Sequence, residues 1–181
     1  FKAVLNRYVE YCQEGNILKG STSADHTTSQ LNWLNSKAGF ITNGLWLETE
    51  MQDYIPPEFE MAFCASPLIT TEQTPTLVLQ SNNLAVAEKT KNLENALAFI
   101  RFMYRDDVQL EFMSKYSYLS ALTSIDYEDA ELTDVARDTL DYINSGNINV
   151  INCNVSWDGL VNNTFKAAIN DLTAGNITVD E

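Results

Sequence analysis

The sequence predicts an α/β chain, in which helices and short strands alternate along 181 residues. Three observations support this fold class. Apolar residues in several segments recur at the three- and four-residue spacing of one helix face. Short apolar runs between these segments are bounded by Gly, Pro and Asn, as strands usually are. The two kinds of segment follow one another in alternation, which is typical of a sheet covered by helices.

The first segments are predicted to be helical. Residues 1–14 carry apolar side chains at the spacing of one helix face. A second helix is expected over residues 27–37, with Asp25 or Thr27 as its N-cap. Residues 46–54 form a further helical segment, which Pro56 and the proline after it stop. Short strands are predicted over residues 40–41, 59–65, 77–79 and 84–87.

The second half is predicted to contain four helices and one strand. Asn92 is expected to cap the helix LENALAFIRFMY, and Asp106 or Asp107 the helix VQLEFMSKY. We interpret the apolar stripes of these two helices as core. Two further helices are expected over residues 128–143 and 156–172, with a strand at 147–155 between them.

The charge balance argues against nucleic-acid binding. The chain has 25 acidic and 11 basic residues, for a formal net charge of −14. Such a surface is repelled by phosphate backbones and by anionic lipid heads. No window approaches the roughly 18 apolar residues of a membrane span.

Cysteine and histidine are too sparse for a metal site. Cys12, Cys64 and Cys153 lie far apart, and His26 is the sole histidine. We therefore expect no metal and no cofactor, and we expect buried free thiols. One long-range disulfide stays open if the compartment is oxidising.

No catalytic residues are predicted. The chain has no GxSxG, no phosphate-binding loop and no GxGxxG. Glu48 and Glu50 are two residues apart on a predicted helix and point away from each other, which favours a solvated acidic face. A glycoside-processing enzyme remains an alternative, and it would need Glu48 or Glu50 to face Asp158 across a cleft.

The candidate ligand site is aromatic. Trp46 and Trp157 each follow a predicted strand or turn and precede a helix, at the edge of an α/β sheet that faces a ligand crevice. A tryptophan there can stack on the apolar face of a pyranose, while the neighbouring Asn43 and Asp158 hydrogen-bond its hydroxyl groups. The alternative is that both tryptophans are core residues of a non-catalytic interaction domain.

Four stretches in order resemble a known family: QLNWLNSKAGFITNGLWLETEM, PPEFEMAFCASPL, KNLENALAFIRFMYRDDVQLEFMSKY and VSWDGLVNNTFKAAINDLTAGNITVDE. Together they cover nearly all of the chain and are similar to the C-terminal half of a family 1 extracellular solute-binding protein, related to maltose-binding protein. This resemblance implies a type II periplasmic-binding-protein fold, in which two α/β lobes close over a sugar.

The resemblance also implies partners, a location and site residues. It implies delivery of a mono- or oligosaccharide to the membrane permease of an ABC importer, outside the cytoplasm, by a cell-surface lipoprotein or a periplasmic protein. The sequence of residues 57–63 resembles the corresponding segment of family members that bind N-acetylglucosamine or oligosaccharides. Trp46 matches the tryptophan that stacks on the sugar, and Trp157 falls near a second stacking aromatic. Asn43 and Asp158 are added from their proximity to these rings.

The same resemblance divides the chain between lobes. Residues 1–68 and 125–181 belong mostly to the C-terminal lobe, residues 76–121 to the N-terminal lobe, and residues 69–75 and 122–124 to hinge crossovers. The N-terminal half of the family fold is expected to be absent from this chain, and no capping residue precedes the first helix. We expect the apolar stripes of residues 76–121 to pack abnormally or to pair with another copy.

Overall fold

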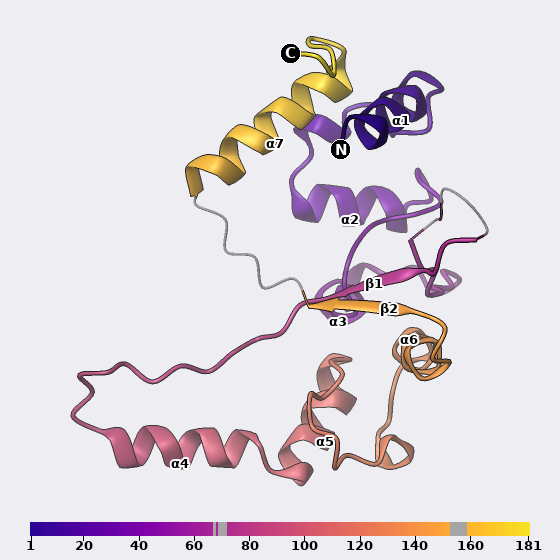
Figure 1. Ribbon diagram of the computed structural model, residues 1–181. Helices are drawn as coiled ribbons and strands as arrows, with labels where there is room; N and C mark the ends of the chain where they lie inside the picture. Colours follow the sequence, from indigo (N-terminus) through magenta and orange to yellow (C-terminus); the bar gives the residue numbers. More distant parts are fainter. Residues whose placement is uncertain (67, 69–71, 153–158) are drawn as a thin grey trace. The chain divides into compact units, whose positions relative to one another are not determined.

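The chain contains helices and a small parallel sheet, arranged in two compact units (Figure 1). The computed structural model describes residues 1–66, 68, 72–152 and 159–181. The first unit comprises Phe1–Thr42 with Val155–Glu181, and the second comprises Asn43–Asn154. The mixed α/β class is confirmed. The two-lobe topology and the division of residues between its lobes stay predictions.

The first unit is built from helices, and a side-chain cap fixes the start of one of them. The Thr28 amide donates to Asp25 Oδ1 over 2.7 Å, so Asp25 is the N-cap of the second helix. Hydrogen bonds from the Thr28 side chain and backbone hold the pKa of Asp25 below its ordinary value. The helices of this unit are α1 (Lys2–Gln13), α2 (His26–Leu34) and α7 (Gly159–Ala174), with a 3-10 turn at Ser21–Ser23.

Helices α1 and α7 contact each other within this unit. The hydroxyl groups of Tyr8 and Thr173 lie 2.7 Å apart. Burial is the main cause of the raised pKa of Tyr8. The rings of Phe1 and Phe165 lie 6.4 Å apart at their centroids. The two contacts use Phe165 and Thr173, which are about two turns apart on α7, so α7 is held at two separate points.

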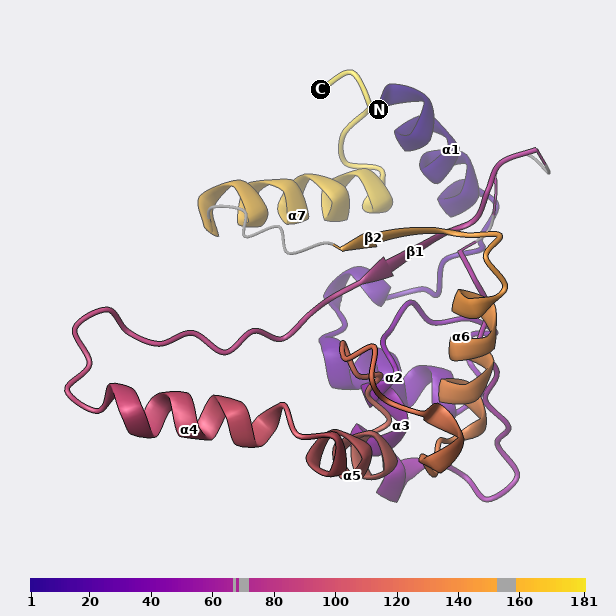
Figure 2. The ribbon, with the colours of Figure 1, turned by 60° about the horizontal axis from the view of Figure 1, so that its bottom comes forward.

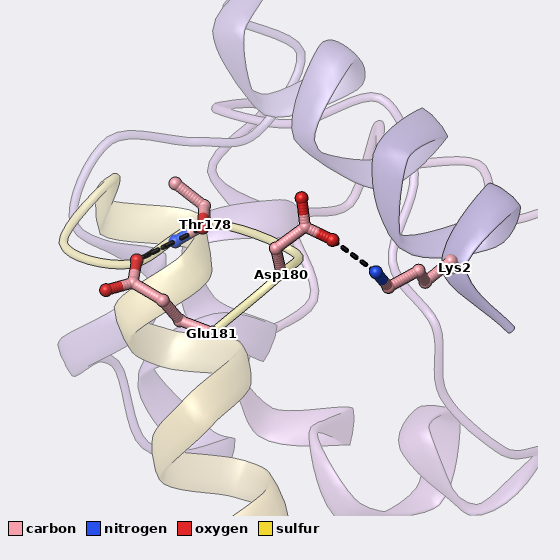
Figure 3. A network of polar contacts seen from close by, with 4 residues as sticks. All are labelled: Lys2, Thr178, Asp180 and Glu181. Atoms are coloured by element: carbon pink, nitrogen blue, oxygen red, sulfur yellow. Dashed lines mark hydrogen bonds and ion pairs between the residues drawn. The ribbon is translucent and has the colours of Figure 1, made fainter.

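The C-terminal residues extend the contact between α1 and the end of the chain. Figure 3 shows Lys2 in an ion pair with Asp180, and Glu181 Oε2 accepting hydrogen bonds from the amide and hydroxyl of Thr178. Lys2 and Asp180 are both exposed, so their pair contributes little to stability. The hydrogen bonds between Thr178 and Glu181 are local, and they hold the last four residues in a turn.

A parallel pair of strands organises the second unit. β1 (Thr76–Leu79) pairs with β2 (Asn149–Asn152), and the register runs from Thr76 opposite Asn149 to Leu79 opposite Asn152. Parallel strands need a long crossover connection, and here it contains three helices. These are α4 (Leu93–Met103), α5 (Asp106–Tyr116) and α6 (Asp134–Asn144).

One buried apolar cluster of the second unit lies between α5 and the segment that follows it. Met113, Ile125 and Ala130 are buried, and four partly buried apolar residues pack around them: Leu110, Leu122, Tyr127 and Leu132. The short helix α3 (Trp46–Glu50) contacts α5 within the same unit. Short 3-10 turns lie at Gln52–Tyr54 and Tyr127–Asp129. The Thr133 hydroxyl accepts from the Ala136 amide at the start of α6.

Helix α4 differs from its neighbours because none of its residues is buried. In Figure 2 it extends away from the other helices of its unit, and its C-terminal end lies next to α5, which it contacts. Phe99 and Phe102 are 55% and 48% exposed. Of the stripe predicted as core on α4, Leu93 is exposed and the other four residues, Ala96, Leu97, Ile100 and Met103, are half-buried, so none of them is a core residue. On α5 the prediction is correct for Met113, whereas Val108 is half-buried and Phe112 and Tyr116 are exposed.

Three of the predicted strands do not form. Residues 40–41, 59–65 and 84–87 are described, but they lie outside the strands. A strand needs a partner for its backbone N–H and C=O groups, and in the described part of the chain only β1 and β2 pair. An apolar run without a pairing partner therefore did not form a strand in these three segments.

Helix boundaries also differ from the predictions. Arg105, and neither Asp106 nor Asp107, is the N-cap of α5. Both aspartates lie in its first turn, where negative charge favours the helix. The helix expected over residues 128–143 begins only at Asp134, because Thr133 provides its cap. The other helices and β2 are shifted or shortened by a few residues.

The predicted burial of the cysteines is not general. Cys64 is exposed and Cys12 is partly exposed, and both thiols are free. Burial alternates along residues 59–65, and Cys64 lies on the exposed side, next to the half-buried Phe63, whose ring packs against Tyr142. Cys153 lies outside the described residues. No helix within the described ranges is long and apolar enough to cross a membrane.

We expect truncation of Met113 to destabilise the second unit far more than truncation of Phe99. Met113 is 1% exposed and Phe99 is 55% exposed. Met113→Ala should lower the free energy of unfolding by about 2–5 kcal/mol, as deletions in a packed core do. Urea unfolding followed by circular dichroism would measure both variants. Equal losses for Met113→Ala and Phe99→Ala would contradict the position of the core.

Candidate ligand-binding site

The turn before α3 is fixed by two short-range hydrogen bonds. The Gly44 amide donates to Asn43 Oδ1 over 2.8 Å. The Leu47 amide donates to the Gly44 carbonyl over 3.1 Å, which closes the turn and begins the helix. The Asn-Gly pair thus places Trp46 at the first position of α3.

Gly44 permits a close approach of the Trp46 ring. A Cβ atom built on Gly44 would lie 2.0 Å from Cζ3 of Trp46 and 2.3 Å from Cε3 and Cη2. Such distances are far below van der Waals contact, so no residue with a side chain fits there without moving the indole. The six-membered ring of Trp46 therefore packs directly against the Gly44 backbone. The absence of a side chain at position 44 sets the position of the ring.

The burial of α3 is provided by other residues. Leu47 is 5% exposed and Met51, one turn later, is 2% exposed. Residues four apart lie on the same side of a helix, so these two anchor α3 to its unit. Trp46 is half-buried, unlike these two residues.

Asn43 retains hydrogen-bonding capacity. Its Oδ1 is occupied by the Gly44 amide, whereas its Nδ2 has no partner within residues 1–66, 68, 72–152 and 159–181. The side chain is half-buried and lies three residues before Trp46. The turn can therefore offer two amide N–H donors together with an aromatic surface.

Glu48 departs from the prediction of a solvated acidic face. Its Oε2 atom is buried and has no hydrogen-bond partner in the described part of the chain. The Glu48 residue as a whole is half-buried. Glu50, by contrast, is exposed as predicted. Nothing in the sequence indicated the burial of Glu48, because it depends on how α3 packs within its unit.

The structure brings together half of the predicted site. Asn43 and Trp46 lie in one turn, with Gly44 between them. Trp157 and Asp158 lie outside the described residues, so their part in the site stays a prediction. The same holds for the catalytic pairing of Asp158 with Glu48 or Glu50. The Asn-Gly pair indicated a turn, but nothing in the sequence predicted the close packing of Gly44 against the indole.

No group of three or more possible metal ligands was found among the residues that the structure describes. The chemistry of the turn is that of stacking and hydrogen bonding. An aromatic surface with a few polar groups is the usual composition of a small-molecule site.

We expect Gly44→Ala to displace the Trp46 ring. In a chain that carries Trp33→Phe and Trp157→Phe, Trp46 is the sole tryptophan. Its emission should then move to longer wavelength and its quenching by acrylamide should increase, because the added methyl group occupies the position of the ring. Gly39→Ala is the matched control, since a Cβ at Gly39 meets no atom within 4 Å. Identical emission in the two alanine variants would contradict the close packing.

Residues 2–139 match the protein family described as bacterial extracellular solute-binding protein. This range covers most of the chain and includes the turn at Asn43–Trp46. Comparison with curated proteins gave no match, and comparison with solved structures gave none.

Proposed function

The chain belongs to the bacterial extracellular solute-binding protein family, and we propose that its solute is a carbohydrate that stacks on Trp46. Proteins of this family provide the solute-binding component of ABC transport systems and are typically non-catalytic. The observation that carries the proposal is the half-buried indole of Trp46, held against Gly44 at the start of α3.

The position of Trp46 favours a binding role over a core role. Leu47 and Met51 bury α3, so the helix does not need the indole as its anchor. The apolar face of a pyranose ring can stack on the accessible part of an indole. The Nδ2 group of Asn43 can donate to a sugar hydroxyl beside it. Trp157 would add a second stacking ring and Asp158 a hydrogen-bond acceptor.

The finer parts of the proposal come from the resemblance to family 1. They are a mono- or oligosaccharide ligand, a membrane permease that receives it, and a location outside the cytoplasm as a lipoprotein or periplasmic protein. The two-lobe type II fold would signal binding by closing over the sugar. N-acetylglucosamine and its β-linked dimer are the first ligands to test, because the segment PPEFEMAF is similar to members that bind such sugars.

Replacing Trp46 should remove affinity without unfolding the protein. We expect the full chain to bind at least one sugar of a panel that includes N-acetylglucosamine and chitobiose, measured by isothermal titration calorimetry. Trp46→Ala should weaken this binding at least about tenfold, or 1.4 kcal/mol, because the stacking surface is lost. The melting temperature should change little.

Trp33→Ala provides the control for this experiment. Trp33 is on α2, and its indole N–H donates to the Gly39 carbonyl. This variant should bind the sugar as the unaltered chain does. A large fall in melting temperature for Trp46→Ala, with no sugar bound by the unaltered chain, would place Trp46 in the core and refute the proposal. Loss of turnover of a glycoside in Glu48→Gln would instead support the enzymatic alternative.

Self-association of the chain is a further expectation. It depends on the exposed apolar side chains of the segment 76–121, which include Val78, Leu79, Leu84, Leu93, Phe99 and Phe102. Analytical ultracentrifugation should show a dimer whose fraction rises with concentration and falls in the double variant Phe99→Glu, Phe102→Glu. A monomer at every concentration would contradict this expectation.

A further inference from the structure

A groove on the second unit has the features of a second binding site. It lies between helix α6 and the segment 124–128, is open to solvent and has a volume of about 370 Å³. Volumes of about 300–1,000 Å³ are usual for small-molecule sites. All of its lining residues belong to the second unit, and none is near α3 in the sequence. No residue of the Trp46 turn or of α3 lines the groove.

The groove combines an apolar base with charged walls. Leu140 and Ile125 line its base and are 8% and 7% exposed, so they present a small apolar surface there. Arg137 and Asp141 from α6 line the groove on one side. Asp126 and Glu128 line it from the preceding segment, and all four charged side chains are solvent-exposed. The groove thus carries one positive and three negative charges.

The charges of the groove do not neutralise one another. Arg137 and Asp141 are four residues apart on α6, a spacing at which opposite charges can pair. Even so, Arg137 forms no ion pair with any residue in the described part of the chain. Glu128 and Asp141 likewise have no cationic partner among those residues. The Arg137 guanidinium and the Glu128 and Asp141 carboxylates line the same groove and can pair with a ligand.

Other polar groups in the groove are already used. Asp126 Oδ1 accepts from the Glu128 amide over 3.0 Å, which caps the 3-10 turn. The Tyr127 hydroxyl donates to the Ser120 carbonyl over 3.1 Å. The Ser124 hydroxyl donates to Asp106 Oδ1 over 3.0 Å. Recognition would therefore fall chiefly to Arg137, Asp141 and Glu128.

We propose that this groove binds an α-amino acid, with a basic side chain preferred. The ligand carboxylate would pair with Arg137, whose guanidinium suits bidentate binding of carboxylates. The ammonium groups would pair with Asp141 and Glu128. The methylene groups of a lysine or arginine side chain would lie on Leu140 and Ile125. A basic amino acid fits better than a neutral one, because carboxylates outnumber the guanidinium.

The exposure of the charged side chains sets the expected salt dependence. Attraction between exposed charges is screened over about 8 Å at physiological ionic strength. Binding of L-lysine should therefore weaken as salt is added. A ligand held by apolar contacts alone would not show this dependence.

The test is a titration of the ¹⁵N-labelled full chain with L-lysine, followed by amide chemical shifts. Saturable shifts should be concentrated in residues 124–128 and 137–144. Arg137→Gln should weaken L-lysine binding about tenfold, but it should leave 1,5-diaminopentane, which lacks the carboxylate, little changed. Asp141→Asn should weaken both ligands. L-glutamate should bind less tightly than L-lysine.

Arg101→Gln is the matched control, because Arg101 is exposed on α4 and does not line the groove. It should bind L-lysine as the unaltered chain does, and circular dichroism would verify that each variant is folded. No saturable shift would overturn the proposal. So would shifts located elsewhere, or L-lysine binding that is unaffected by both Arg137→Gln and Asp141→Asn. The outcome is independent of sugar binding at Trp46.

Discussion

The parallel pairing of β1 with β2 is the constraint on which the second unit depends. It joins Thr76 to Asn149 and so closes a long stretch of chain that contains α4, α5 and α6. Closing a long loop has an entropic cost, which the contacts within that loop must offset. The cluster of Met113, Ile125 and Ala130 makes such contacts. Parallel strands are usually covered on both faces, whereas Val78 here is 61% exposed and Ile151 is 52% exposed.

Within this frame, the unit presents two surfaces of different chemistry. The turn before α3 presents an indole and an amide, because Leu47 and Met51 anchor the helix and Gly44 leaves room for the ring. The groove beside α6 presents separated charges over an apolar base. Under the two proposals made above, the first surface takes a neutral, hydroxyl-rich ligand and the second takes a zwitterion.

The sequence predicted local features well and long-range features poorly. The cap at Asp25 and the helix starting at Trp46 depend on neighbouring residues, and both are observed. The strand at residues 77–79 is also observed, because residues 149–152 pair with it. The alternation of apolar and polar residues over 59–65 predicted a strand. A strand forms only where another segment of the chain pairs with it, and none pairs with this one in the described part of the chain. The exposure of α4 and the burial of Glu48 Oε2 also depend on packing partners far along the chain. Periodicity identifies an apolar face, and it does not identify what covers that face.

The most direct test of sugar stacking on Trp46 is ¹⁹F NMR of the chain labelled with 5-fluorotryptophan, during titration with the saccharide panel. The three tryptophans give separate signals, and Trp→Phe variants assign them. If a sugar stacks on Trp46, the Trp46 signal should show a saturable shift with at least one sugar, while the Trp33 signal stays unchanged. If no sugar shifts the Trp46 signal, or if a sugar binds while that signal remains unmoved, the indole at the start of α3 is not the stacking surface.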